Sequence, residues 1–306
     1  MALTKSSPKP NWLKIRPPGG ENYTRLKQLF RSLNLNTVCE EASCPNVAEC
    51  WGGGTATVML LGDTCTRGCR FCHVNTGKPG GVVDELEPIK VGTALGQMEL
   101  TYVVLTSVDR DDLPDGGADH FARTVEEIKK RSPSTLVEVL IPDFKADTKS
   151  LDRILSSGAD VIAHNVETVK RLTPRVRDPR CGYEQSLEVL RYLKSTKPSV
   201  HTKSSLMVGL GETQEEMGIA MDDLRAVDCD ILTVGQYLRP SQKHLEVQEY
   251  VHPSVFEAYE AMGLEKGFLF VPSGPLVRSS YRAGEKFLEA VIRGERQAKP
   301  TFAKDL

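Results

Sequence analysis

Residues 54–72, Gly-Thr-Ala-Thr-Val-Met-Leu-Leu-Gly-Asp-Thr-Cys-Thr-Arg-Gly-Cys-Arg-Phe-Cys, constrain the fold more than any other stretch. The apolar run from Ala56 to Leu61 is typical of a strand that is buried on both faces. The loop after it carries Cys65, Cys69 and Cys72, spaced as CxxxCxxC. Three thiolates this close in sequence can reach three different irons of a cubane iron–sulfur cluster and leave the fourth iron open. The stretch therefore predicts a buried strand that leads directly into a metal-binding loop.

Strand-like and helix-like patterns alternate along the chain after this stretch. The further apolar runs that suit strands are 102–105, 136–141, 161–163, 206–208 and 231–234. Apolar residues recur at helical spacing between them, at 121/125/128, 151/154/155, 187/190/193 and 217/221/224. Six strand–helix units in succession predict a parallel sheet covered by helices.

Polar side chains just after several strands distinguish two possible architectures. They occupy 106–109, 164–167 and 209–212. In a barrel the C-terminal ends of the strands build the active site, although an open doubly wound sheet also uses that edge. The pattern favours the α/β class with a partial (β/α)6 TIM-like barrel, and the doubly wound sheet is the alternative. The turn at Gly209 to Thr213 has the wrong glycine spacing for a phosphate-binding loop, and Thr213 with Glu216 predicts a helix capping box instead.

Extensions flank the predicted barrel, which we assign to residues 55–275. The N-terminal extension, 1–54, contains Leu26, Leu29, Phe30 and Leu33 at the spacing of a short amphipathic helix. The C-terminal extension, 276–306, follows one more apolar, strand-like run at 268–271.

Composition excludes several classes of function. The 306 residues carry a net charge of −2, with 40% hydrophobic and 26% charged residues, which is ordinary for a globular protein and gives no general reason to bind nucleic acid or an anionic membrane. The chain shows neither a leader-type apolar segment nor a membrane span, so we expect a cytoplasmic protein. Six of its eight cysteines fall between Cys39 and Cys72. Since cytosolic proteins rarely keep disulfides, such crowding indicates metal binding or redox chemistry.

A second set of three cysteines, Cys39, Cys44 and Cys50, precedes the first. It either shares ligands with the CxxxCxxC loop or holds a cluster of its own with a distant fourth ligand. Cys181 and Cys229 are candidates for that ligand. The alternative is that both are small apolar residues buried in the core. The alternative for the CxxxCxxC loop is a zinc site, which needs four ligands and which His73 could complete.

The motifs resemble those of one enzyme superfamily and, within it, those of one family. The CxxxCxxC loop, with Phe71 before its third cysteine, resembles the signature of radical S-adenosylmethionine (SAM) enzymes. Four longer stretches, 39–51, 54–67, 108–118 and Arg278-Ser-Ser-Tyr281, resemble the lipoyl synthase family, and the likeness covers roughly residues 9–285. Arg70 and His73 depart from the residues usual in that family.

The resemblance implies an enzyme that inserts sulfur at C6 and C8 of an octanoyl chain carried on a protein lysine. It implies two [4Fe–4S] clusters, one on Cys65, Cys69 and Cys72 that cleaves SAM to a radical, and an auxiliary one that is consumed as sulfur donor. The implied auxiliary ligands are Cys39, Cys44, Cys50 and, by motif position, Ser280, with Ser279 the second choice. Without the resemblance, we would interpret this serine as an ordinary surface residue.

The resemblance also implies partners and a SAM pocket. The partners are octanoylated lipoyl domains of 2-oxoacid dehydrogenase E2 subunits or the glycine cleavage H protein, and an electron donor such as flavodoxin or ferredoxin. The predicted SAM contacts are Phe71, His73 and Leu238 at the adenine, Ser107 and Asp109 at the methionyl amine, Asn165 and Glu167 at the ribose or amine, and Arg177 and Lys203 at the carboxylate. We expect no catalytic residues beyond the cluster ligands.

Three other functions compete with this one. A radical SAM enzyme could use its second cluster to carry electrons or to bind substrate, and that cluster would persist through turnover. A noncatalytic iron–sulfur carrier would show clusters with four cysteine ligands each, whereas both sets here supply three. A zinc-dependent interaction protein would contain zinc in place of iron.

Overall fold

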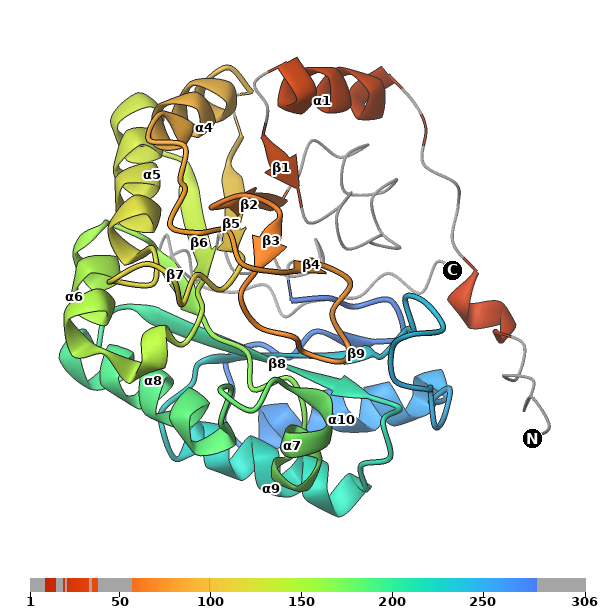
Figure 1. Ribbon diagram of the computed structural model, residues 1–306. Helices are drawn as coiled ribbons and strands as arrows, with labels where there is room; N and C mark the ends of the chain where they lie inside the picture. The colour runs from red at the N-terminus through yellow and green to blue at the C-terminus, as the bar shows by residue number, and fades with distance from the viewer. Residues whose placement is uncertain are drawn as a thin grey trace.

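Six parallel strands, each followed by a helix, curve inside an arc of helices in the computed structural model (Figure 1). The structure describes residues 9–14, 19, 21–32, 35–37, 57–98 and 100–279. In chain order the six units are β2 (Thr57–Leu60) with α4 (Glu87–Gly96), β5 (Tyr102–Ser107) with α5 (Ala118–Arg131), β6 (Leu136–Leu140) with α6 (Thr148–Ser156), β7 (Val161–Ala163) with α8 (Tyr183–Thr196), β8 (His201–Val208) with α9 (Gln214–Arg225), and β9 (Ile231–Gln236) with α10 (Pro253–Glu265). The prediction of six strand–helix units is confirmed.

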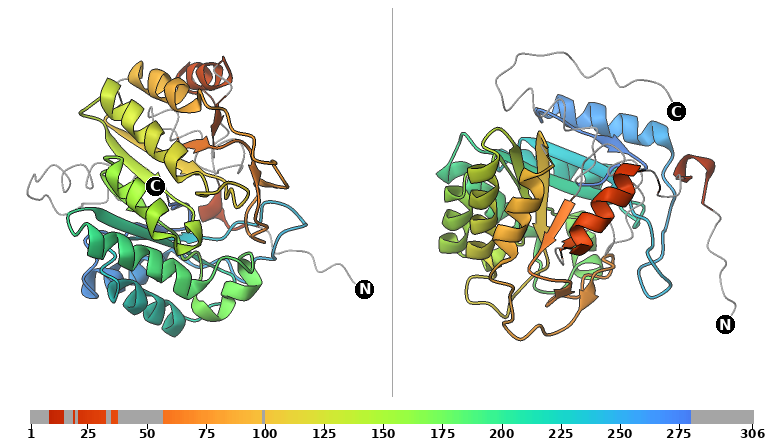
Figure 2. Two further views of the ribbon diagram at one scale, coloured as in Figure 1. Left: turned by 60° about the vertical axis from the view of Figure 1, so that its left-hand side comes forward. Right: turned by 90° about the horizontal axis from the view of Figure 1, so that it is seen from above.

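The order of the strands decides between a barrel and a doubly wound sheet. Strands β2, β5, β6, β7, β8 and β9 pair in chain order, and every pair is parallel. A doubly wound sheet reverses its strand order at a switch point, whereas a sheet that always advances in one direction winds into a barrel. The predicted partial barrel is therefore confirmed, with its helices on the outer face of the sheet (Figures 1 and 2).

Apolar patterning explains why these elements form and where they pack. On α5, Phe121, Val125 and Ile128 recur one helical turn apart, and all three are buried against the sheet. One large core joins β2, β5 and β6 to helices α4 to α6, and a second joins β8 and β9 to α9 and α10. A third, smaller cluster contains both Tyr102 of β5 and Ile231 of β9, so strands from distant parts of the curved sheet share it.

Short elements at both ends of the sheet complete its edges. Strand β1 (Asn36–Thr37) pairs antiparallel with β2, and β10 (Ser273–Gly274) pairs parallel with β9. Helix α1 (Glu21–Ser32), which confirms the predicted N-terminal helix, leads into β1 and buries Phe30 in the first core. The described part of the N-terminal extension therefore packs directly onto the barrel.

Some boundaries differ from those predicted. The prediction for β8 covers only 206–208, but the strand begins at His201 because Thr202 and Ser204 are buried there as well. The run 268–271 contributes one bridge, between Phe270 and Ile231, and the last named strand begins later, at Ser273. The helical spacings given from the sequence cover α5, α6, α8 and α9, and the positions of α4 and α10 were not specified.

The remaining elements lie in the connections. They are β3 (Thr64–Cys65) and β4 (Asn75–Thr76), which pair in parallel, the 3-10 turns η1 (Asn11–Leu13), η2 (Phe144–Ala146) and η3 (Lys170–Leu172), and the short helix α7 (Thr173–Val176). Strands β3 and β4 bracket the loop that carries Cys69 and Cys72. No helix among the described residues is long and apolar enough to cross a bilayer.

Candidate active site

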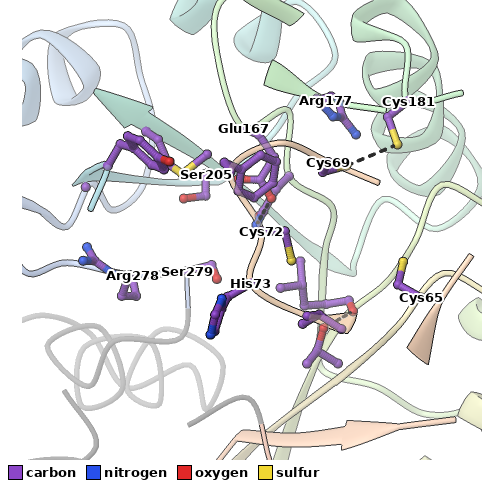
Figure 3. Close-up of a pocket in the computed structure, with 18 of the residues that line it drawn as sticks. Cys65, Cys69, Cys72, His73, Glu167, Arg177, Cys181, Ser205, Arg278 and Ser279 are labelled. Atoms are coloured by element: carbon purple, nitrogen blue, oxygen red, sulfur yellow. Dashed lines mark hydrogen bonds between the residues drawn. The ribbon is translucent and has the colours of Figure 1, made fainter. Parts of the chain in front are cut away.

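A cavity of about 570 Å³ opens at the C-terminal ends of the strands. Its walls include all three thiols of the CxxxCxxC loop, which face it from different sides (Figure 3). The loops after β5, β6, β7 and β9 supply most of the other walls, among them the residues after the second and fourth predicted strands. The prediction that polar strand ends gather is confirmed for 106–109 and 164–167. The turn at 209–212 does not line the cavity, since Glu212 accepts hydrogen bonds from the backbone N–H groups of Gly209 and Leu210. The capping box predicted for Thr213 and Glu216 is confirmed at the start of α9.

Three distant segments hold the CxxxCxxC loop in place. The Asp109 carbonyl accepts from the Thr66 N–H at 2.9 Å, and Asp178 accepts from the Gly68 N–H at 2.8 Å. On the far side, the His244 ring lies 2.9 Å from the Cys72 carbonyl. Since the three anchors belong to different strand–helix connections, the loop is fixed before any ligand binds.

Arg67, between the first two cysteines, is the centre of a buried charge cluster. Its side chain is only 2% exposed and donates to both carboxylate oxygens of Asp111 and of Asp143 at 2.5–2.9 Å. Asp109 lies 3.4 Å from the same guanidinium. Such bidentate pairs fix geometry as well as charge, so Arg67 ties the cysteine loop to the strand ends of β5 and β6.

The thiols sit in surroundings that favour their neutral form in the absence of a cation. Burial raises the pKa of Cys65 to about 12 and also raises the pKa of Cys72. The pKa of Cys69 is raised chiefly by its hydrogen bond with Cys181 and then by burial. Ligation therefore has to displace protons from this site, as thiolate coordination generally does.

The arrangement of the thiols separates the two metal hypotheses. Among the described residues, no three His, Cys, Asp or Glu side chains are placed to hold one metal ion. Zinc needs four ligands around a single ion, so the zinc interpretation with His73 finds no support here. Ligands of a cubane instead bind separate irons, and three thiols spread around one cavity fit that requirement.

Four predicted residues after β5 and β7 line the cavity together: Ser107, Asp109, Asn165 and Glu167. The Ser107 hydroxyl and the Asn165 carbonyl oxygen are buried and find no hydrogen-bond partner among the described residues. Both atoms are therefore free to form hydrogen bonds with a molecule that enters the cavity. Burial raises the pKa of Glu167 and raises the pKa of Asp109 to about 6, so both carboxyls can change protonation when a charged ligand enters.

The other predicted contacts divide into those inside and outside the cavity. Phe71, His73, Arg177 and Leu238 line it, and Arg177 is held by a 2.8 Å hydrogen bond to the Ser186 hydroxyl. Lys203 does not line it. Its ammonium pairs with both oxygens of Glu138, at 2.8 and 2.9 Å, deeper in the barrel.

The predicted auxiliary ligands, Cys39, Cys44, Cys50 and Ser280, lie outside the described residues. The residues just before Ser280 are described, and Arg278 and Ser279 line the cavity. Gly235 at the end of β9 permits this path, because a Cβ there would lie 2.2 Å from the Val277 carbonyl oxygen. The chain therefore crosses the end of β9 toward the cavity as it enters the C-terminal extension.

Several cavity residues were not predicted. Asp143 and Tyr237 follow β6 and β9, and the strand-end rule would have found them had it been applied to every strand. Cys181 was considered only as a buried residue or a fourth auxiliary ligand. It is buried, but it lies beside Cys69 with the two sulfurs 3.9 Å apart.

Solved structures resemble the fold at low sequence identity. Methylornithine synthase matches with a TM-score of 0.52 and 14% identity, over 85% of this chain and 84% of its own. The FeFe-hydrogenase maturase from Carboxydothermus hydrogenoformans matches with a TM-score of 0.52 and 12% identity, over 89% of this chain and 80% of its own. These likenesses support the architecture alone.

Sequence comparisons are far more specific. The model of the radical SAM superfamily matches residues 59–224, and that of the N-terminal domain of lipoyl synthase matches 3–44. Lipoyl synthase of Myxococcus xanthus is 56% identical over 96% of this chain and 98% of its own length, and that of Thermus thermophilus is 59% identical over 93% and 88%. The mitochondrial lipoyl synthase of Bos taurus is 54% identical over 92% and 77%. With a cavity that gathers the three thiols and two unsatisfied polar atoms, and with relatives that are 54–59% identical over at least three quarters of their length, the chain belongs to the lipoyl synthase family of the radical SAM superfamily.

Proposed function

We propose that this chain inserts two sulfur atoms, at C6 and C8, into an octanoyl chain bound to a carrier protein. Membership of the radical SAM superfamily implies a [4Fe–4S] cluster and SAM, and membership of the lipoyl synthase family implies protein-bound octanoyl substrates. The observation that carries the proposal is the cavity itself. The CxxxCxxC thiols, the unsatisfied Ser107 and Asn165 oxygens and the segment leading to Ser280 border the same space.

Cys65, Cys69 and Cys72 would hold the first cluster. When bound, this cluster supplies the electron that cleaves SAM, and SAM supplies the radical that removes hydrogen from an unactivated carbon. The protein's part is positioning. The anchors from Asp109, Asp178 and His244 keep the three thiols in place, and the buried walls exclude water from the reacting groups.

The SAM contacts follow from the cavity walls. Ser107 and Asp109 would accept from the methionyl amine, and Asn165 with Glu167 would bond the ribose hydroxyls. Arg177 would pair with the carboxylate, since it is the one member of the predicted carboxylate pair that lines the cavity. Phe71, His73 and Leu238 would surround the adenine. Lys203 is left out of this site because Glu138 already neutralises it.

The auxiliary cluster would be bound by Cys39, Cys44, Cys50 and Ser280. Two described segments that lead toward these ligands support this assignment. Strand β1 ends two residues before Cys39, and Ser279, next to Ser280, lines the cavity. Alkoxide is a less favourable iron ligand than thiolate, so the iron on Ser280 would dissociate first and expose sulfide to the substrate radical. In this proposal 1–54 and 276–306 serve the auxiliary cluster and 55–275 forms the radical SAM barrel.

The proposed partners are octanoylated lipoyl domains of 2-oxoacid dehydrogenase E2 subunits or the glycine cleavage H protein. A flavodoxin or ferredoxin would supply electrons, and we assign the reaction to the cytoplasm, where thiols stay reduced. Substrate presentation by a carrier is tested by comparing free octanoate with an octanoylated carrier domain. We expect turnover of the carrier-bound chain, and equal turnover of the free acid would contradict carrier delivery.

Iron content tests the two-cluster assignment. Protein purified and reconstituted without oxygen should hold about eight iron and eight acid-labile sulfide, the content of two cubanes. Replacing Cys65, Cys69 and Cys72 together by Ala should leave about half of each. Loss of all the iron, or none of it, would show that the clusters do not have separate ligand sets.

The sacrificial role of the auxiliary cluster is tested with Ser280→Cys. A thiolate should keep the cluster intact and abolish sulfur insertion, while 5′-deoxyadenosine production continues. The wild-type protein should stop near one lipoyl group per chain unless its cluster is rebuilt. Sustained turnover with an intact auxiliary cluster would favour the alternative, a radical SAM enzyme whose second cluster carries electrons or binds substrate.

A further inference from the structure

Cys181 has no role in the proposed function, yet it lies in the wall of the site. It belongs to the short loop before α8 and is 5% exposed, and it lines the cavity beside Cys69. The two sulfurs are 3.9 Å apart, as the dashed line in Figure 3 marks. The other spare cysteine differs, because Cys229 is fully buried and its sulfur contacts only backbone carbonyls, those of Thr202 and Ile231, among the described residues.

The same short loop holds both sulfurs of this pair. The Asp178 N–H donates to Cys69 Sγ at 3.3 Å, and the Asp178 carbonyl accepts from the Cys181 N–H at 2.8 Å. On the other side, Arg67 donates to Cys181 Sγ at 3.3 Å. These contacts keep the two sulfurs side by side although 112 positions separate them in the sequence.

We infer that Cys69 and Cys181 form a reversible disulfide whenever Cys69 carries no iron. A disulfide joins its sulfurs at about 2 Å, so these two have to approach by roughly a further 2 Å. Both residues lie in loops, outside helices and strands, so small rotations about their side-chain bonds and small shifts of the loops can supply this movement.

The oxidant for this step is a low-molecular-weight disulfide such as oxidised glutathione. One of the two cysteines attacks it as a thiolate and forms a mixed disulfide, which releases one reduced glutathione. The other cysteine then attacks the mixed disulfide, closes the Cys69–Cys181 bond and releases the second. Two protein thiols lose two protons and two electrons, and one oxidised glutathione becomes two reduced molecules.

The linkage would protect the site reversibly. A thiol in a disulfide is kept from oxidation to sulfinic acid, which is not readily reversed, and reduction returns it. The competition between this bond and iron rests on the proposed function, in which Cys69 is a cluster ligand. Formation of the bond in iron-free protein does not, and the experiment keeps the two questions apart.

Trypsin maps this linkage directly. Cleavage after Arg67 and Arg70 places Cys69 alone on the tripeptide 68–70, and cleavage after Arg180 and Arg191 places Cys181 alone on 181–191. The full chain is freed of iron with a chelator under reducing conditions, incubated with oxidised glutathione, alkylated and digested. We expect most of the tripeptide 68–70 to be recovered in disulfide linkage to 181–191 and released by dithiothreitol. Recovery of Cys69 linked mainly to Cys65, to Cys72 or to glutathione would overturn the inference.

Two variants complete the test. In Cys181→Ala, Cys69 should instead be recovered as a mixed disulfide with glutathione, whereas Cys229→Ala should give the wild-type map. Reconstituted Cys181→Ala should bind as much iron as the wild-type protein. A loss of about four iron atoms would make Cys181 a cluster ligand and overturn its assignment as a disulfide partner outside the ligand set.

Discussion

Arg67 is a buried cation whose partners come from three other parts of the chain. Its carboxylate contacts, Asp109, Asp111 and Asp143, follow β5 and β6, and Cys181 precedes α8. Removing one member of such a network leaves a buried charge uncompensated, which is far costlier than losing an exposed pair. Arg67 therefore ties the cysteine loop to the strand ends of β5 and β6 and to the loop before α8.

His164 gives the site a defined response to acid. It is fully buried, its ring nitrogens lie 3.0 Å from the Ile141 carbonyl and 2.9 Å from the Ser186 hydroxyl, and burial together with nearby Arg177 lowers its pKa to about 4. In the unfolded chain His164 takes up a proton near pH 6.5, whereas in the folded chain it stays neutral down to about pH 4. The free energy of unfolding therefore keeps its full contribution from His164 above pH 6.5 and loses it as the pH falls toward 4. The shift corresponds to about 3 kcal/mol.

We predict that His164→Gln removes this component. Urea unfolding of the iron-free wild-type protein at pH 7 and pH 4.5 should show the decline, and the variant should show a smaller one. The comparison between the two proteins cancels the contribution of His201, whose pKa burial also lowers. An identical decline in both proteins would mean that His164 accepts its proton without disrupting the fold.

Residues of the site differ in how far the sequence predicts them. Ser107 and Asn165 were found because they directly follow apolar runs, and parallel strands bring such positions to one edge. The partnership of Cys69 with Cys181 was not, because it depends on how the loop before α8 folds back over the cysteine loop, and no local pattern records a contact between residues so far apart in the sequence.

A buried ion pair between Lys203 and Glu138 joins strands β8 and β6 on the inner face of the curved sheet. Lys203 lies two positions before Ser205 and so points to the same inner face, but it reaches Glu138 instead of the cavity. The Tyr102 hydroxyl donates to the same carboxylate at 2.6 Å. Tyr102 also belongs to the apolar cluster that contains Ile231, so the ion pair borders that cluster.

We predict that Lys203→Met destabilises the fold without weakening SAM binding. The variant leaves Glu138 buried and unpaired, which should cost about 3–5 kcal/mol in unfolding free energy. The double variant Glu138→Leu with Lys203→Met should recover most of that loss. Unfolding in urea measures the first effect and equilibrium dialysis of SAM against reconstituted protein the second. A tenfold weaker SAM affinity in the double variant would restore Lys203 to the predicted carboxylate site.

Elements were predictable where one residue class dominates. Helix α5 and strand β7 follow apolar spacing, and their predicted positions hold. Strand β8 was predicted too short because its first residues, such as Thr202 and Ser204, are polar but bury themselves against neighbouring strands. The run 268–271 is not a named strand, yet its backbone pairs with β9: Leu269 donates to the Asp230 carbonyl, and the Phe270 carbonyl accepts from Leu232. Phe268 and Val271 also pack into the second core.

The whole molecule depends on two apolar cores that meet at the cysteine loop. Asp109, an anchor of that loop, follows a strand of the first core, while Asp178 and His244 belong to segments beside the second. Destabilising either core should therefore release the loop.

We predict that Phe121→Ala in the first core and Phe256→Ala in the second both expose the loop. Each residue is no more than 1% exposed, so each truncation should cost about 3–5 kcal/mol. Alkylation of Cys72 in iron-free protein should accelerate about 100-fold or more in both variants. It is followed on the tryptic peptide 71–90, because trypsin does not cleave between Lys78 and Pro79. Val82→Ala, at a position that is 74% exposed, should leave the rate unchanged. Acceleration in only one core variant would mean that one half holds the loop alone.

Because the chain is synthesised from its N-terminus, the cysteine loop is made before two of the residues that anchor it. The ribosome releases Cys72 well before Asp178 and His244, which complete the grip on its loop, and at roughly 10 residues per second the delay is on the order of 10–20 s. During that interval the CxxxCxxC thiols of the nascent chain are exposed to solution, because the segments that contain Asp178 and His244 have not yet been synthesised. The partner thiol of Cys69, at position 181, emerges with these segments, so a newly made chain passes through a period in which its cysteines meet metals and oxidants before the fold can select among them.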